Sequence, residues 1–335
     1  MNKISRILMG VVLFSILAGS TEGQLIVYDV DGSTWTHGHG INDAGQTVGY
    51  HLLAATGDER FSFIREPEGS FSLSGDSLPC PPICGPDQAH SITNAGDVVG
   101  NFGDDLNHGY IRTAGGTLIT FDVPASANTF ADGINAALQV SGYFDDAVCL
   151  APPAPCSHGF IRDFSGAFVI FDVPGSTGTF PGKINDLGQV AGSYNDLAGD
   201  SHGFIRNANG TFVTFDVPGS VATEAQAINN AGFVTGAYLT FEASTGFRRH
   251  GFVRSPSGVY QTIDVPGARA TIPSGINNNG DVTGSFEVVT GSGRESHGFI
   301  LTGAAAGTSI PTLSVWAMIL LMLSLIPLAM WMLKR

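Results

Sequence analysis

The chain has 335 residues, a formal charge of −14 and 45 glycines, and only 13% of its residues are charged. Its hydrophobic content of 43% is too high for a disordered chain. The excess of acidic side chains argues against nucleic acid as a ligand, because phosphate binding needs clustered Lys and Arg. Many glycines and few charges favour short strands joined by tight turns.

The first 20 residues form a predicted secretory signal peptide, with a second cleavage register that ends at Gly23. Lys3 and Arg6 supply the positive charge, and Ile7–Ala18 is the apolar segment. An uncleaved N-terminal anchor is the alternative, although a membrane span needs about 20 apolar residues. We therefore expect the protein to be exported.

Four close cysteines support export, because an even number of cysteines in an exported chain favours disulfides in an oxidising compartment. We expect Cys80 to bond Cys84 and Cys149 to bond Cys156, since short loops cost less entropy to close than long ones. Pairing between the two segments is the alternative. A zinc site is a third interpretation, but no histidine lies at ligand spacing from either pair.

Between the two ends, one sequence unit recurs six times. Its landmarks are His-Gly-aromatic-aliphatic-Arg, aromatic-Asp-Val-Pro and Ile-Asn-x-x-Gly-x-Val-x-Gly, as in His202–Arg206, Phe215–Pro218 and Ile228–Gly236. The period of 42 to 51 residues is typical of propeller blades. The pattern resembles the HAF-type extracellular repeats of bacterial exported proteins. That resemblance implies export and a repeat architecture, but no activity.

Each copy contains four short runs of strand-forming residues with turn signals between them. In the fourth copy, strands are predicted near Ile184 and at Val190–Tyr194, Gly203–Arg206 and Phe212–Val217, with an Asn-Gly turn before the last. Four strands repeated six times predict an all-β fold, a six-bladed β-propeller over residues 24–302. A β-solenoid is the alternative.

The order of the strands at the two ends predicts how the ring closes. The chain begins with a fourth-strand sequence, Ile26–Val30, and its repeats end with a third-strand sequence, His297–Leu301. In a closed propeller the N-terminal strand would complete the last blade and cover its free edge.

A histidine and an aspartate recur 14 residues apart, and a hairpin between them would place them within reach. The first copy has Phe61 and Gly75 at these positions, so both members are lost together, as expected for partners. A catalytic site is rarely built five times, so we expect structural pairs that satisfy buried polar groups. The expected pairs are His108–Asp122, His158–Asp172, His202–Asp216, His250–Asp264 and His297–Asp29.

Histidines outside the repeat gather in the first two copies. His39 and His90 occupy the same repeat position, which Asp132 fills in the third copy. The first strand of a blade is innermost, so we expect these side chains, with His37, at the mouth of a central channel. Imidazole and carboxylate groups suit zinc or a transition metal, so the four residues are a candidate metal site. Solvated channel lining is the alternative.

A second apolar segment, Trp316–Leu333, is followed by Lys334 and Arg335 and is connected to the repeats by a small-residue linker at 303–309. The segment is long enough to cross a bilayer as a transmembrane helix, and the basic pair places its end in the cytoplasm. A buried core helix is the alternative, which the position beyond all repeats disfavours.

A short motif precedes this apolar segment: Ile310, Pro311, Thr312 and Leu313, with Trp316 soon after. Motif, span and basic tail together, residues 310–335, resemble the IPTL-CTERM protein-sorting signal of Gram-negative bacteria. The resemblance implies an exosortase-like membrane enzyme as a partner. It also implies an inner-membrane anchor in transit and final delivery to the cell surface or the outside.

Connections of variable length between the second and third strands would share one face of a propeller, and such loops usually carry recognition. The sequence has none of the common hydrolase, phosphate-binding or zinc-protease motifs, and we expect no cofactor. We predict a non-catalytic module that binds a glycan, matrix component or protein through this face. The alternative is a propeller enzyme that acts on polysaccharide with acids or histidines outside the repeat.

Overall fold

The structure is a computed structural model that describes residues 23–53, 59–73, 87–103, 106–147, 156–243, 246–291 and 293–306. These residues form 24 β-strands and one short 3-10 helix, η1 (Ala304–Ala306). None of the helical structure in these ranges is long and apolar enough to span a membrane. The predicted signal peptide, the sorting motif with its apolar segment, and Cys80, Cys84 and Cys149 lie outside the described residues.

Antiparallel pairing groups the strands into six four-stranded units, which we number along the chain. Units 1 to 3 are β2 (Ser33–Ile41), β3 (Thr47–Leu53), β4 (Arg60–Arg65) and β5 (Phe71–Leu73); β6 (Asp87–Ile92), β7 (Val98–Phe102), β8 (His108–Arg112) and β9 (Leu118–Phe121); and β10 (Ser126–Ile134), β11 (Val140–Asp146), β12 (Ser157–Arg162) and β13 (Phe168–Phe171).

Units 4 to 6 follow the same pattern, except that the fourth strand of unit 6 is the first strand of the chain. They are β14 (Gly178–Ile184), β15 (Val190–Asn195), β16 (Ser201–Arg206) and β17 (Phe212–Phe215); β18 (Ala222–Ile228), β19 (Val234–Glu242), β20 (Gly246–Arg254) and β21 (Tyr260–Thr262); and β22 (Ala270–Ile276), β23 (Val282–Thr290), β24 (Gly293–Leu301) and β1 (Leu25–Tyr28).

The strand prediction for the fourth copy is confirmed within one or two residues for its second to fourth strands. The prediction for units 5 and 6 was less accurate, because the variable stretches expected to be loops are largely strand. β19 and β20 stay paired up to Glu242 and Gly246, and β23 and β24 up to Thr290 and Gly293. Alternating side chains can extend a hairpin past the repeat without changing its register.

The motif Ile-Asn-x-x-Gly-x-Val-x-Gly builds the turn between the first and second strands of each unit. In unit 5, the Asn229 N–H donates to the Phe233 carbonyl across the turn. Gly232 has a φ of 82°, a left-handed conformation that favours glycine. Gly236 is required for a different reason, since a Cβ there would collide with the Glu224 carbonyl on the neighbouring strand.

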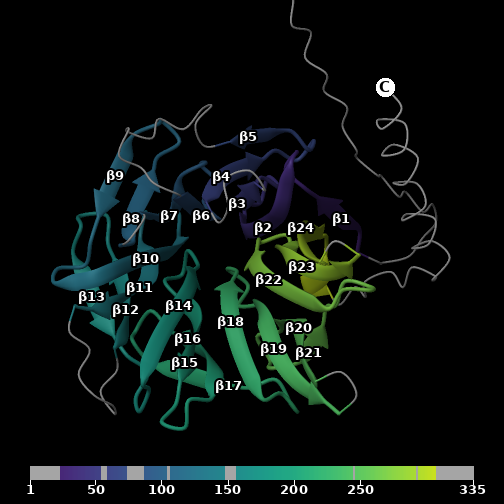
Figure 1. Cartoon of the computed structure of the whole chain (residues 1–335). Helices are drawn as coiled ribbons and strands as arrows, with labels where there is room; N and C mark the ends of the chain where they lie inside the picture. Colours follow the sequence, from purple (N-terminus) through teal and green to yellow (C-terminus); the bar gives the residue numbers. More distant parts are fainter. Residues whose placement is uncertain are drawn as a thin grey trace, which may run out of the picture.

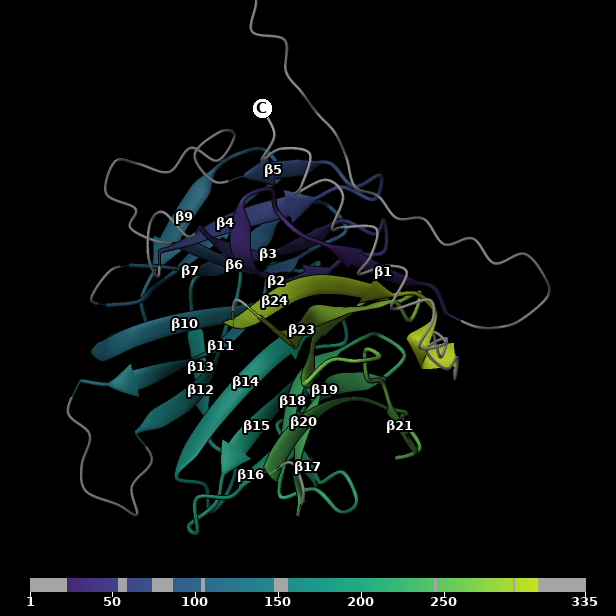
Figure 2. The ribbon, with the colours of Figure 1, turned by 45° about the vertical axis from the view of Figure 1, so that its right-hand side comes forward.

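The units lie around a common centre, with the first strand of each unit nearest to it (Figure 1), and Figure 2 shows the same arrangement in an oblique view. β1 pairs antiparallel with β24, in the register Leu25–Leu301 to Tyr28–Gly298. Two single parallel bridges, Arg249–Ala270 and Trp35–Ser296, join units 5, 6 and 1 into one 12-stranded sheet. The two ends of the described chain therefore lie side by side.

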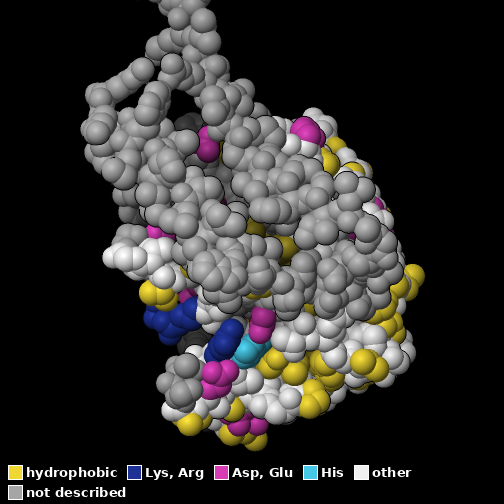
Figure 3. All heavy atoms as spheres, turned by 90° about the vertical axis from the view of Figure 1, so that its right-hand side faces the viewer, with side chains coloured by type: hydrophobic (Ala, Val, Ile, Leu, Met, Phe, Trp, Pro, Cys, Tyr) yellow, Lys and Arg dark blue, Asp and Glu magenta, His cyan; other side chains and the backbone are white. Residues whose placement is uncertain are grey.

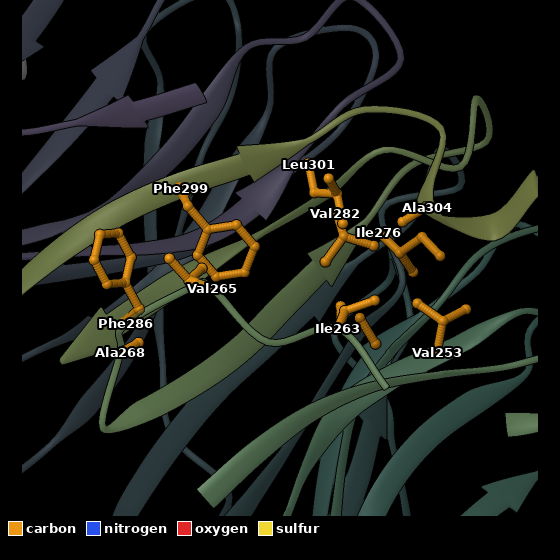
Figure 4. Close-up of a cluster of buried hydrophobic side chains, with 11 residues drawn as sticks. Val253, Ile263, Val265, Ala268, Ile276, Val282, Phe286, Phe299, Leu301 and Ala304 are labelled. Carbon is orange, nitrogen blue, oxygen red and sulfur yellow. The ribbon is translucent and has the colours of Figure 1, made fainter. Parts of the chain in front are cut away.

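The apolar core is divided into six clusters, each of which combines residues of two consecutive units. Figure 4 shows the cluster between units 5 and 6, where Phe286 and Phe299 lie beside Val265, and Ile276 lies with Val282 at the other end of the cluster. The cluster between units 6 and 1 packs Tyr28 and Ile300 against Phe63. Burial of these side chains between sheets is the main stabilising contribution to such a fold.

An aromatic side chain in the third strand of five units is almost completely buried: Phe63, Phe160, Phe204, Phe252 and Phe299. Each follows the repeated glycine of the His-Gly-aromatic landmark, or its counterpart in unit 1. On the surface, the view in Figure 3 shows small groups of hydrophobic side chains among charged and uncharged polar ones. Scattered exposed apolar groups of this kind are normal for a folded domain.

Candidate ligand-binding site on the inner strands

The turns that follow the innermost strands are joined into a belt of hydrogen bonds around the centre. The first turn residue of a unit donates its side-chain amide to the equivalent carbonyl of the next unit, at 3.0 to 3.1 Å. The donors are Asn42, Asn135, Asn185, Asn229 and Asn277. This belt, made of the repeated Asn, surrounds a hollow lined by residues of all six units.

One interface has no belt bond among the described residues. Between units 2 and 3, Thr93 replaces the donor asparagine, and Ala136 replaces the side chain that elsewhere accepts from the main chain of the preceding unit. In its place, His90 Nδ1 lies 2.7 Å from Asp132 Oδ1 and links the two units nearer the middle of the strands. Both belt positions are therefore replaced at the same interface.

The structure brings all five expected His–Asp pairs together. In each pair the histidine Nδ1 lies 2.7 to 3.0 Å from the carboxylate, and the His297–Asp29 pair joins the two ends of the repeat region. The pairs differ in burial, and not all of them are buried as expected: the exposed fractions of the side chains are 40% and 50% for His108 and Asp122, but 12% and 29% for His250 and Asp264. The pairs lie at the end of a hairpin, where solvent reaches both groups.

Unit 1 lacks this pair because its histidine and its aromatic ring have exchanged places between the second and third strands. In the other units, an aromatic ring of the second strand packs on the paired histidine, as Tyr194 packs on His202 at 5.2 Å. In unit 1 the histidine, His51, stands on the second strand and Phe61 on the third, with ring centroids 5.9 Å apart. His51 is buried, and burial holds its pKa below the ordinary value.

His39, His90 and Asp132 lie at bulges in the innermost strands. The pairing register of β2, β6 and β10 shifts by one residue at these positions. A bulge leaves its extra residue unpaired and redirects the side chain, which often happens beside functional sites. The predicted gathering of His37, His39, His90 and Asp132 is therefore present.

The rings of Trp35, His37, Tyr50, His39 and His90 form a continuous series, which we call the aromatic row. Successive centroids are 5.7 Å apart for Trp35–His37, 5.0 Å for His37–Tyr50, 5.2 Å for Tyr50–His39 and 4.9 Å for His39–His90. Trp35 pairs with Leu52 at the end of the hairpin opposite to the belt. The row therefore runs from that end toward the middle of the inner strands.

The row is only partly covered, and its polar atoms are largely unused. Trp35, His37, His39 and Tyr50 are half-buried. Within the described ranges, no hydrogen bond reaches the indole nitrogen, the hydroxyl or the imidazole nitrogens of these four side chains. Half-buried rings with unpaired polar atoms are suited to ligands that offer both apolar faces and hydroxyl groups.

Burial and nearby charges decide the protonation state of the imidazoles in the aromatic row. Burial and the Arg60 guanidinium lower the pKa of His37 to about 4. Burial also holds the pKa of His39 well below its ordinary value, with further contributions from His90 and Lys183. Both histidines are therefore neutral at pH 7.

Lys183 is a functional candidate that the sequence analysis missed. It is 7% exposed, and burial lowers its pKa to about 8, against the opposing effect of the Asp132 charge. A signal was present in the sequence. The residue before the repeated isoleucine is Gly, Ser or Ala in the other five copies, and only the fourth has a lysine. Trp35 and Tyr50 were missed because they follow no motif.

The predicted metal site does not have the arrangement of a metal centre. In the part of the chain that the structure describes, no three His, Cys, Asp or Glu side chains are grouped so that they could hold a metal ion. His39 and His90 stack face to face instead, and His90 is bonded to Asp132. We therefore propose no metal ion at these four residues.

The predicted disulfides stay predictions. Cys156 is the only cysteine in the described ranges, and it is not free. It lies at the end of the variable connection of unit 3, directly before β12, and its carbonyl accepts from the Asp146 N–H at 3.0 Å.

Comparisons with known proteins support the fold class. No protein-family model matches the chain, and no curated protein matches it. Among solved structures, TolB from Acinetobacter baumannii is similar, with a TM-score of 0.53 and 14% identity over 77% of this chain. The match covers 64% of TolB, so the chain spans less than two thirds of it.

A second similar structure is a subtype N11 neuraminidase-like protein of A/flat-faced bat/Peru/033/2010, with a TM-score of 0.44 and 9% identity. The match covers 88% of this chain and 96% of the neuraminidase-like chain. At these identities a likeness concerns the fold alone. The chain is thus an all-β protein with a β-propeller-like fold.

Proposed function

We propose that the six units are the blades of a closed propeller and that β1 completes the last blade. The pairing of β1 with β24 supports this arrangement. It is also supported by the core cluster shared by units 6 and 1 and by the belt bond from Asn277 to the Asn42 carbonyl. A closed ring would leave no unpaired sheet edge at the ends of the chain.

We propose that this propeller is a non-catalytic binding module for a glycan and that the aromatic row is its recognition site. The main support for this proposal is the set of half-buried rings whose polar atoms have no hydrogen-bond partner among the described residues. Trp35 and His37 stand at positions where the other units have different residues, whereas Tyr143 of unit 3 occupies the Tyr50 position and His90 of unit 2 the His39 position. Most units lack these rings, so the repeat does not require them. Rings supply rigid contact area, and their polar atoms can pair with sugar hydroxyls.

A glycan-array screen of the purified full chain, followed by calorimetry on the best oligosaccharide, tests this proposal. Trp35→Ala and Tyr50→Ala should each lower the affinity by about tenfold or more, the loss of about 1.4 kcal/mol. Phe247→Ala is the matched control, because this ring is 61% exposed at the tip of the β19–β20 hairpin. Equal losses in all three variants, or no glycan binding at all, would contradict the proposal.

The alternative function, a polysaccharide-acting enzyme, rests on the His90–Asp132 pair beside the row. A carboxylate bonded to an imidazole is able to transfer protons. Incubation of the glycan with the full chain, with a readout of new reducing ends, distinguishes the two functions. Release that disappears in Asp132→Asn would support the enzyme, whereas unchanged glycan supports the binding module.

We also propose export with a C-terminal anchor that an exosortase-like enzyme removes, on the basis of the sequence signals alone. Mass spectrometry of the protein recovered from the cell surface tests this. A mature chain that begins after residue 20 and ends near the motif at 310–313 is expected. Intact residues 1–20, or an intact apolar segment on released protein, would contradict the respective half.

A further inference from the structure

The aromatic row has a cation at each end. At its outer end, Arg60 places its guanidinium carbon 5.4 Å from the centre of the Tyr50 ring. At its inner end, β14 of unit 4 places Lys183 beside β10, since a Cβ added at Gly133, the residue after Asp132, would lie 2.7 Å from the Lys183 Cα. The two cations are contributed by different units, so their position along one row results from the fold and not from a local sequence pattern.

Neither cation is neutralised by a direct partner within the described ranges. No ion pair within 4 Å involves Arg60 or Lys183 there, whereas Arg249 of unit 5 pairs with Glu224 at 2.8 Å. Lys183 is more than nine-tenths buried and has no hydrogen bond in the described part of the chain. A buried ammonium without a partner is costly, so a position of this kind favours an external anion.

Part of the negative charge near the row is already engaged. Asp132 Oδ1 is bonded to His90 at 2.7 Å, whereas its Oδ2 is buried without a hydrogen-bond partner among the described residues. Glu224 is engaged by Arg249 at 2.8 Å. Glu287 on β23 pairs with Ser296, which in turn bridges to Trp35 at the outer end of the row. His37 and His39 are neutral, so Arg60 and Lys183 are the positive groups of the row.

This local balance differs from the rest of the molecule, which has a net charge of −14. Beyond the Debye length, about 8 Å at physiological salt, the distant acidic groups are largely screened. A polyanion would therefore feel only the charges close to it. Acidic parts of the surface would repel it, and Arg60 and Lys183 would attract it. Such a contrast favours specific over non-specific binding of an acidic ligand.

We propose that the ligand of the aromatic row is an acidic glycan with carboxylate-bearing sugars, which Arg60 and Lys183 bind while the rings contact the sugar faces. This inference rests on the proposed glycan-binding function and adds the class of sugar. A guanidinium and an ammonium both form charge-assisted hydrogen bonds with carboxylates. A neutral glycan would leave the Lys183 ammonium unpaired.

Binding of two commercial probes to the full chain tests the class of ligand: oligogalacturonate as the acidic oligosaccharide and cello-oligosaccharide of the same length as the neutral one. Calorimetry should show tighter binding of the acidic probe, by about tenfold or more, because hydrogen bonds to charged groups are worth about 1.5–3 kcal/mol. The preference should shrink as NaCl is raised from 50 to 500 mM.

Two charge-removing variants assign the preference to these residues. Arg60→Gln and Lys183→Met should each reduce the affinity for oligogalacturonate about tenfold and leave weak binding of the neutral probe unchanged. Arg162→Gln is the matched control, because it removes the same charge from a guanidinium that lies 4.9 Å over the Phe121 ring on the outer strands. A circular dichroism melt of each variant confirms that it is folded.

The outcomes separate this inference from the proposed function. Equal binding of both probes, lost in Trp35→Ala, would overturn the acidic class and leave glycan binding in place. Preference for the acidic probe that Arg162→Gln reduces as much as Lys183→Met would overturn the assignment to the row. Absence of binding to either probe or to any array glycan would contradict both.

Discussion

The interface between units 6 and 1 and the interface between units 2 and 3 differ most in how the inner strands are held. Between units 6 and 1, Asn277, Asn278 and Asn279 make four hydrogen bonds to Asn42 and Asp43. Between units 2 and 3, the equivalent turns make none among the described residues, since Thr93 and Ala136 replace the bonding side chains. The backbone repeats at both, so side chains at two turn positions decide the difference.

The interface between units 6 and 1, which has more hydrogen bonds, joins the most distant parts of the sequence. Its belt bonds connect residues 235 positions apart, whereas the interface between units 2 and 3 connects neighbouring repeats. The entropy lost on closing a loop grows with loop length, although slowly. Additional hydrogen bonds between units 6 and 1 offset part of this cost, and the pairing of β1 with β24 adds to them.

The largest expected effect comes from removing β1. A chain without residues 24–30 loses its pairing with β24 and the Tyr28 ring, which packs edge-on against Phe63 and lies under the Arg65 guanidinium. We expect the melting temperature to fall by about 10 °C or more, since a domain of this size loses about 2–4 °C per kcal/mol. Differential scanning calorimetry measures this. An unchanged melting curve would show that β1 does not close the fold.

A smaller effect is expected at the belt itself. Asn277→Ala removes the donor to the Asn42 carbonyl, together with the bonds between the Asn277 side chain and Asp281 in its own turn, and should lower the free energy of unfolding by about 2 kcal/mol. The Asn42 carbonyl still accepts from the Gly45 N–H, so the loss comes from the removed hydrogen bonds and not from an unpaired acceptor. Thr93→Ala, at the equivalent position of unit 2, is the matched control and should cost less. Urea unfolding of both variants compares the two interfaces, and equal losses would mean that the belt adds no stability.

The sequence predicted most of the fold because the repeat encodes it directly. Spacing placed His202 beside Asp216, and the order of landmarks placed Asp29 beside His297. The extension of β19 and β20 was not predicted, since Leu239–Arg249 carries no repeat landmark. Strand pairing there depends on cross-strand contacts that a single sequence does not reveal.

The candidate site was predicted less well. His37, His39 and His90 were recognised by their deviation from the repeat, but their chemistry was taken for that of metal ligands. Whether imidazoles stack or converge on one point depends on bulges and side-chain rotamers, which a sequence does not show. Lys183 belongs to another unit, so only the arrangement of the inner strands around a common centre places it beside β10 and Asp132.

The missing belt bonds between units 2 and 3 can be restored by substitution. Thr93→Asn should allow the new amide to reach the Asn135 carbonyl, and Ala136→Asn should supply an acceptor for the Asn94 N–H. We expect the double variant to gain about 1–2 kcal/mol in the free energy of unfolding, from two net hydrogen bonds. Urea unfolding of the double and both single variants measures the gain. A loss in all three would show that this interface cannot adopt the geometry of the others.

The smallest expected effect concerns the His297–Asp29 pair, which joins β24 to the residue after β1. The hydrogen bond from His297 to Asp29 raises the pKa of this histidine above its ordinary value, against a smaller lowering by burial. A raised folded-state pKa means that protonation stabilises the folded chain. The contribution is therefore complete below about pH 6.5, the pKa of an unfolded histidine, and is lost as the pH rises through the folded-state value.

Because the pair is partly exposed, we expect its contribution to stay below about 1 kcal/mol. Urea unfolding of the natural chain and of His297→Gln at pH 5.5 and pH 8.5 measures it. The natural chain should be the more stable of the two by a larger margin at pH 5.5, and the margin should shrink at pH 8.5. A margin that is equal at both pH values, or larger at pH 8.5, would mean that the charged form of His297 does not hold the closing strand.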